Sequence, residues 1–106
     1  KGHPWEIAKS FDGSCPLSPF VPPSQIKDRS NIEFQLKING ELRQHGKTKE
    51  MITPINPLLS YISQHFTLLP GDVILTGTPA GVGPLLSGFK LEASLESVLH
   101  VETVVK

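Results

Sequence analysis

The chain has 106 residues and a formal net charge of zero, because ten Lys and Arg side chains balance ten Asp and Glu side chains. This length suits one small domain with a modest core, and the balanced charge argues against a nucleic-acid surface. No apolar stretch is long enough to cross a bilayer, and the single cysteine, Cys15, cannot form an internal disulfide. We therefore expect a soluble protein of a reducing, intracellular compartment that binds neither nucleic acid nor membranes.

Ten prolines and nine glycines indicate a β-rich α+β fold in which helix is the minority. The first segment, 1–23, is rich in proline and aromatic residues and has little periodicity. This composition is typical of an ordered active-site loop that packs against another part of the protein, since flexible linkers lack Trp and Phe. The chain begins at Lys1-Gly2 without an initiating methionine, and we interpret it as a fragment.

The clearest predicted strand is 32–38, where apolar side chains alternate with polar ones. The apolar positions are Ile32, Phe34, Leu36 and Ile38. Asn39-Gly40 follows, and both residues tolerate the positive φ of a type I′ turn. We therefore expect residues 41–44 to return antiparallel to the first strand as a hairpin.

One short amphipathic helix is predicted after this hairpin. Asn56 is the expected N-cap and Pro57 is expected in the first turn, while Leu58, Leu59, Ile62 and Phe66 fall on one face. Further on, 70–72 predicts a turn and 73–76 a short buried strand. The alternating runs 91–95 and 99–105 predict a second hairpin around Glu96-Ser97.

Lys9 is the first candidate for chemistry, because it lies between apolar neighbours in a segment crowded with aromatic residues. A partly buried ammonium there would stabilise a carboxylate or a developing enolate. The alternative is a surface lysine paired with Glu6 or Asp12.

The second candidate is the run 75–84, LTGTPAGVGP, in which a strand end enters a glycine-rich loop. Its spacing matches neither the P-loop nor the dinucleotide-binding fingerprint. It offers a backbone that a ligand can approach closely, with the Thr78 hydroxyl as a polar group. A tight turn that needs glycine for its conformation is an equally good interpretation.

The remaining reactive side chains form no convincing site in the sequence. Cys15 with His45 would suggest a thiol nucleophile and base, but nothing orients either residue. The four histidines lack the paired spacing of a metal site, and the carboxylates fall mostly on predicted solvent faces or turns. We therefore assign no metal ligand within this chain.

Three strings together resemble one family: KGHPWEIAKSFDGSCPLSPFVP at 1–22, KINGELRQHGKTKEMI at 37–52 and GDVILTGTPAGVGP at 71–84. The chain resembles the fumarylacetoacetate hydrolase superfamily, most closely its acylpyruvase and oxaloacetate branch. The likeness covers nearly the whole chain. It implies that 1–106 is the carboxy-terminal part of a single catalytic domain built as a mixed β-sandwich roll, usually a homodimer.

The resemblance also implies a magnesium or manganese ion held by three carboxylates, all upstream of Lys1, together with an upstream His-Glu pair. Within this chain, the family's active-site lysine corresponds to Lys9, which would point at the metal-bound 2-oxo acid. The family's substrate-binding threonine corresponds to Thr78, and Gly77 would shape the same contact. Gln44 matches a family motif beside the site, and the resemblance implies no chemical role for it beyond packing or support of the site.

The function implied is metal-dependent chemistry on short 2-oxo acids: hydrolysis of an acylpyruvate C–C bond, or decarboxylation or tautomerisation of oxaloacetate. The expected location is the cytoplasm, with the mitochondrial matrix as the alternative. A second hypothesis is a non-catalytic remnant that binds a partner subunit through exposed strand edges. A third, a thiol hydrolase using Cys15, predicts that Cys15→Ala abolishes activity.

Overall fold

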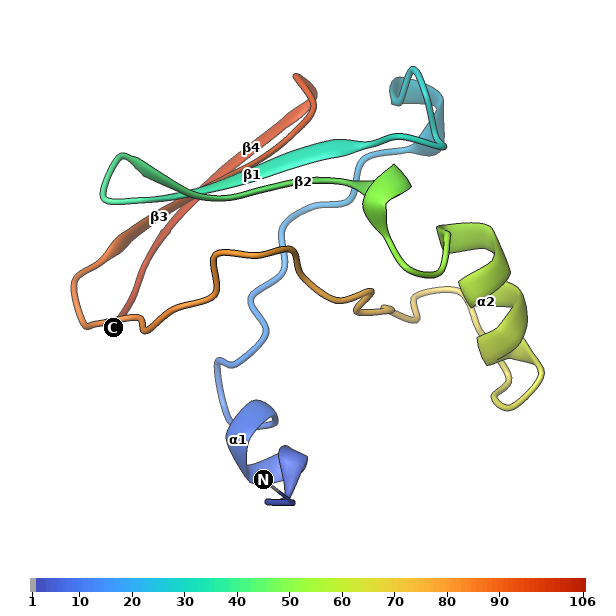
Figure 1. Cartoon of the computed structure of the whole chain (residues 1–106), viewed down its shortest axis with the longest axis horizontal. Coiled ribbons are helices and arrows are strands. Elements are labelled where there is room, and N and C mark those ends of the chain that lie inside the picture. The colour runs from blue at the N-terminus through green and yellow to red at the C-terminus, as the bar shows by residue number, and fades with distance from the viewer. Residues whose placement is uncertain (1) are drawn as a thin grey trace.

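The computed structural model describes residues 2–106 and combines a small antiparallel sheet with short helices and long loops (Figure 1). Lys1, the first residue of the motif at 1–22, lies outside the described residues. In chain order the elements are α1 (Trp5–Lys9), the 3-10 turn η1 (Pro23–Gln25), β1 (Glu33–Ile38), β2 (Glu41–Lys47), the 3-10 turn η2 (Thr48–Glu50), α2 (Ile55–Ser63), β3 (Lys90–Leu95) and β4 (Leu99–Val104). The predicted β-rich α+β class is confirmed.

The four strands form one sheet in the order β2-β1-β3-β4, with every neighbouring pair antiparallel. Both predicted hairpins are confirmed. Asn39 and Gly40 have φ values of 52° and 81°, as a type I′ turn requires. At the other hairpin Glu96 has a positive φ of 48°, and its backbone N–H donates to the Glu33 carbonyl on the neighbouring β1.

The sheet has one polar and one apolar face, because side chains alternate along each strand. The polar face carries Glu33, Gln35, Lys37, Lys90, Glu92, Ser94, His100 and Glu102, and the apolar face carries Phe34, Leu36, Ile38, Leu91, Ala93, Leu95, Leu99 and Val101. Among these apolar side chains only Ile38 is buried, at 7% exposure. The others are half-buried, so the apolar face is only partly covered by residues 2–106.

The α2 helix begins at Ile55, two residues earlier than an N-cap at Asn56 would place it. Pro54 is the N-cap, and no side chain caps the helix, so the prediction that Asn56 is the N-cap is wrong. The physical reason is that Pro54 already has extended backbone angles, and its carbonyl accepts the first helical hydrogen bond, from Leu58 N–H. Pro57 lies in the first turn as predicted, whereas Phe66 lies beyond the helix and is 69% exposed.

The prediction of a buried strand at 73–76 is also wrong. The run 73–79 is not part of the sheet, and most of its side chains are exposed. Val73, Ile74 and Leu75 have the right composition for a strand, but none of the described strands pairs with them. In Figure 1 the long connection from α2 to β3 passes along one side of the sheet instead of joining it.

The amino-terminal segment, interpreted as a loop, contains the one-turn helix α1 and the turn η1. It does not pack as expected, because Trp5, Phe11 and Phe20 remain 71%, 60% and 74% exposed. Figure 1 places α1 well away from the sheet. None of the helices within 2–106 has the length and apolar character of a membrane-spanning segment.

Candidate functional site

Gly77 and Thr78 lie beside a cavity of about 410 Å³. The cavity is bounded by the run 76–79, the end of β2 and the segment that connects η2 to α2. Its apolar wall includes Phe34, Met51 and Leu58. Gly77 has a φ of 97°, a backbone conformation that side chains with a Cβ rarely adopt. The structure therefore places these two adjacent predicted site residues in the lining of a mixed polar and apolar cavity.

Thr78 is bonded to strand β2 through Gln44. The Gln44 amide nitrogen Nε2 donates to Thr78 Oγ1 at 2.8 Å and to the Pro79 carbonyl at 3.0 Å. Gln44 is half-buried, while Thr78 is exposed. The amide thus connects the sheet to the glycine-rich loop at the residue that was predicted to bind substrate.

Two glycines allow the loop to approach β2 this closely. A Cβ on Gly81 would lie 2.0 Å from the Arg43 carbonyl oxygen, and the φ of Gly81 is 103°. A Cβ on Gly46 would lie 2.7 Å from the Phe34 ring and 3.1 Å from the Pro79 ring. Any larger residue at either position would push the loop and the strand apart, because contacts this short are repulsive.

A β-bulge in β2 decides which side chains face the loop. Leu36 pairs with Gln44 while Lys37 pairs with Leu42, so Arg43 is the extra residue. With an unbroken register, Leu36 would pair with Arg43, and Gln44 would point to the polar face. The bulge therefore turns Gln44 and Gly46 toward the run 76–79 and leaves His45 on the polar face, which is how bulges commonly re-aim side chains beside functional sites.

Lys9 is not part of this cavity. It ends α1, is exposed, and its Nζ lies 4.8 Å from the centroid of the Trp5 ring. Partial burial of Lys9 was expected and is not observed, because α1 has no buried residue. The alternative pairing is also absent: within residues 2–106, no ion pair joins Lys9 to Glu6 or Asp12.

Within residues 2–106, no hydrogen bond joins the Cys15 thiol to the His45 ring. Cys15 is a free, exposed thiol in the amino-terminal segment. His45 lies on β2, where its Nε2 is 2.6 Å from Glu33 Oε1. The imidazole is thus engaged with a carboxylate on the adjacent strand.

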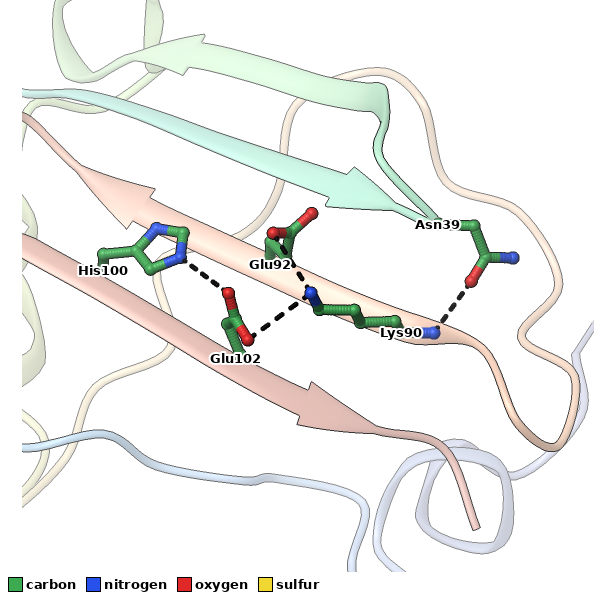
Figure 2. Close-up of polar contacts among 5 residues, drawn as sticks. All are labelled: Asn39, Lys90, Glu92, His100 and Glu102. Atoms are coloured by element: carbon green, nitrogen blue, oxygen red, sulfur yellow. Dashed lines mark hydrogen bonds and ion pairs between the residues drawn. The ribbon is translucent and has the colours of Figure 1, made fainter.

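One cluster of titratable side chains was not predicted from the sequence (Figure 2). The pairing of β3 with β4 gathers Glu92, His100 and Glu102, whose ligand atoms lie within 4.8 Å of one another. His100 Nε2 lies 3.3 Å from Glu102 Oε1, and Lys90 Nζ lies 3.6 Å from Glu92 and 3.5 Å from Glu102. The signal was present in the predicted hairpin, since its register places these side chains on one face.

The Lys90 ammonium supplies positive charge between the two carboxylates, so this cluster is an ion-pair network on the polar face. It lies on β3 and β4, which are two and three strand spacings from β2, or roughly 10 and 14 Å. Hydrogen bonding by His100, and then the charge of Lys90, hold the pKa of Glu102 below its ordinary value.

The residues around Thr78 do not hold a divalent ion by themselves. Magnesium and manganese prefer several oxygen ligands, usually including carboxylates. Among the residues that line the cavity, only Glu50 carries a carboxylate. Glu50 alone does not provide such a ligand set, and we derive no chemical step through a metal.

Comparison with known proteins identifies relatives of the whole chain. The family profile described as "Fumarylacetoacetate (FAA) hydrolase C-terminal" matches residues 1–106. The chain is 49% identical over 106 residues to "Oxaloacetate tautomerase FAHD1, mitochondrial" of Bos taurus, covering 100% of this chain and 48% of the relative. It is 53% identical over 96 residues to "Oxaloacetate tautomerase YcgM" of Escherichia coli K12, covering 90% of this chain and 44% of the relative.

Solved structures agree with this relationship. A fumarylacetoacetate hydrolase family protein from Yersinia pestis CO92 matches with a TM-score of 0.91 and 52% identity, over 99% of this chain and 49% of that chain. A maleylpyruvate hydrolase from Sphingobium sp. SYK-6, in complex with manganese(II) and pyruvate, matches with a TM-score of 0.75 and 30% identity. That alignment covers 80% of this chain and 32% of the hydrolase. The chain spans about half the length of the curated relatives it matches.

Proposed function

Since this chain belongs to the fumarylacetoacetate hydrolase family, we propose that it forms the carboxylate-binding part of a metal-dependent active site that acts on short 2-oxo acids. The reaction we favour is keto-enol tautomerisation of oxaloacetate. Residues 1–106 would then be the carboxy-terminal part of a single catalytic domain. The observation that carries this proposal is the identity of about half of all positions to oxaloacetate tautomerases along the whole chain.

Thr78 supports the proposal by its position. It is exposed and lines the cavity next to Gly77, whose missing side chain leaves the backbone accessible. A substrate carboxylate has only hydrogen-bond acceptors when ionised, so a hydroxyl and exposed backbone N–H groups are suitable partners. We propose that Gly77 and Thr78 bind one carboxylate of the 2-oxo acid.

Lys9 is proposed as the catalytic cation. In the tautomerisation of oxaloacetate, C3 loses a proton and the 2-oxo oxygen gains one, so negative charge develops on that oxygen. A nearby ammonium would lower the energy of this charge. Lys9 lies outside the cavity described above, so its role rests on the family resemblance of the AKSF string at 8–11.

A divalent ion, magnesium or manganese, is proposed as the cofactor, and manganese in the maleylpyruvate hydrolase structure is the supporting observation. When bound, such an ion acts as a Lewis acid toward the 2-oxo acid. Its ligands are proposed to come from the part of the family fold that residues 2–106 do not represent.

The proposed assembly is a homodimer in the cytoplasm, with the mitochondrial matrix as the alternative location. The location is supported by one relative from Escherichia coli and another that is named as mitochondrial. The homodimer rests on the family resemblance alone. The reactions kept beside tautomerisation are loss of carbon dioxide from oxaloacetate and hydrolysis of an acylpyruvate to pyruvate and a carboxylic acid. A related maleylpyruvate hydrolase, 31% identical with a TM-score of 0.88, supports the hydrolytic option.

The test is an assay of the natural protein that carries this chain. Enol-to-keto conversion of oxaloacetate, release of carbon dioxide and cleavage of acetylpyruvate are measured in parallel, with magnesium, with manganese and with a chelator. We expect metal-dependent tautomerisation to be the fastest of the three. Activity that persists in the chelator, or inertness toward all three conversions, would contradict the proposal.

A partner-binding remnant is the second candidate, and one observation favours it. Seventeen large apolar side chains are exposed, whereas Ile38 is the only buried hydrophobic residue among those described. A chain with so much exposed apolar surface is expected to associate. Metal-independent association of a naturally 106-residue product, without turnover, would favour this candidate over the enzyme.

A further inference from the structure

The hydrogen-bond polarity at Thr78 is fixed by its neighbour Pro79. The Gln44 amide group contacts both Thr78 Oγ1 and the Pro79 carbonyl oxygen. A carbonyl oxygen only accepts hydrogen bonds, so the end of the amide that faces it must be the NH₂ group. The same NH₂ group faces Thr78 Oγ1, and the threonine oxygen must therefore accept as well.

The proton of the Thr78 hydroxyl is consequently available for a ligand. A hydroxyl that accepts one hydrogen bond can still donate its own proton. Within residues 2–106, no side-chain hydrogen bond has Thr78 as its donor. The hydroxyl of this exposed, cavity-lining residue is thus held as a donor, and an ionised carboxylate is the acceptor that benefits most from this polarity.

The loop keeps its position by more than this one amide. Gly81 packs directly against the Arg43 carbonyl, and Pro79 packs against the strand at Gly46. These contacts involve the backbone or apolar atoms, and none requires the Gln44 side chain. Changing the polarity at Gln44 should therefore alter the orientation of the Thr78 hydroxyl more than it alters the fold.

We infer that Gln44 is a positioning residue that holds the Thr78 hydroxyl as a hydrogen-bond donor toward a carboxylate of the 2-oxo acid. The inference rests on the proposed function, because it names the ligand group that this site would bind. The bulge at Arg43 is what makes the arrangement possible, since it turns Gln44 toward Thr78.

Gln44→Glu is the decisive variant, because it keeps the size of the side chain and replaces the NH₂ donor with an acceptor. The ionised carboxylate would accept a hydrogen bond from the Thr78 hydroxyl, which would then no longer donate to the ligand. Binding of pyruvate to the natural protein with manganese is measured by calorimetry. A lost charge-assisted hydrogen bond corresponds to a rise of about 10- to 100-fold in the pyruvate Kd. Gln25→Glu, at an exposed position of η1, is the matched control and should leave the Kd unchanged.

A double-variant cycle separates orientation of Thr78 from simple charge repulsion. If Gln44 acts through Thr78, Gln44→Glu should cause little additional loss in a Thr78→Val background. An equal loss in both backgrounds, or a Kd for Gln44→Glu that equals the wild-type value, would overturn the inference while leaving the proposed function intact. Should Gln44→Glu not fold, Gln44→Met replaces it in the cycle with the same two readings.

Pyruvate binding to the wild-type protein shows whether the proposed function itself fails. If the wild-type protein with manganese binds no pyruvate, the proposed function fails, and this inference fails with it. Tautomerisation kinetics on the same variants provide a second reading. A positioning role predicts a higher KM for Gln44→Glu with a melting temperature close to that of the wild type.

Discussion

The Gln44 side-chain amide donates a hydrogen bond of 2.8 Å to Thr78 Oγ1, across 34 positions of sequence. This bond joins the hairpin β1–β2 to the glycine-rich loop, which is not a strand of the sheet. It adds to the packing of Gly81 and Pro79 against β2, which holds Gly77 and Thr78 beside the cavity. Four predictions test the packing, the electrostatics and the chemistry that this arrangement implies.

Gly81→Ala should destabilise the protein by about 2–4 kcal/mol. The new Cβ would lie 2.0 Å from the Arg43 carbonyl oxygen, at a residue whose φ of 103° is already unfavourable for alanine. Urea unfolding of the natural protein measures the change. Gly83→Ala is the control, because its Cβ would meet only Arg43 Nη1 at 3.8 Å. Equal stabilities of the two variants would show that the loop does not pack against β2 as described.

Gly46→Ala should cost about 1–3 kcal/mol, since its Cβ would lie 2.7 Å from Phe34 Cζ at a buried position. Shortening the opposing side chain should relieve the clash. We therefore expect Gly46→Ala to cost less in a Phe34→Leu background than in the wild type. Additive losses of stability in the double variant would contradict the contact between Gly46 and Phe34.

The Glu102 carboxyl should titrate below the ordinary range of an unpaired glutamate, as measured by NMR. Its pKa is lowered by the hydrogen bond with His100 and, next, by the charge of Lys90. A depressed pKa in the folded state means that the unfolded chain binds more protons in acid. The stabilisation is therefore present above the unfolded pKa and is lost as the pH falls through the lowered folded pKa.

Two variants separate the causes of this shift. His100→Ala should raise the pKa of Glu102 more than Lys90→Met does, because the His100 hydrogen bond is the larger cause. An unchanged Glu102 titration in both variants would show that the network of Figure 2 does not form in solution.

Lys9→Met should lower kcat for oxaloacetate by about 100-fold or more, with a smaller change in KM. The reason is that a cation opposite the developing enolate acts mainly in the transition state. Lys27→Met, at another exposed lysine, is the matched control and should leave kcat unchanged. A full kcat for Lys9→Met would remove Lys9 from the catalytic role that the family resemblance assigns to it.

Local signals in the sequence predicted the two hairpins well. The alternation from Ile32 to Ile38 and the Asn39-Gly40 turn are short-range features, and they need no knowledge of the rest of the fold. The β3–β4 hairpin was predicted for the same reason. The bulge at Arg43 was not, because an inserted residue changes the pairing partner without changing the alternation of the first strand.

The failures concern features that depend on tertiary contacts. Residues 73–76 have strand composition, but a strand requires a pairing partner, and none of the described strands provides one. The start of α2 is set by the backbone angles of Pro54, and the preference of Asn for N-cap positions gives no information about those angles. For the site, the binding roles of Gly77 and Thr78 stay predictions from the motif resemblance, whereas the donor role of Gln44 required the positions of Thr78 and Pro79.

The most direct test of the central claim is a crystal structure of the natural protein with manganese and pyruvate. We predict that a pyruvate carboxylate oxygen lies within hydrogen-bond distance of Thr78 Oγ1, with Gln44 Nε2 still bonded to the same threonine oxygen. Pyruvate bound away from Gly77 and Thr78, or a Gln44 Nε2 no longer within hydrogen-bond distance of Thr78 Oγ1, would contradict the account.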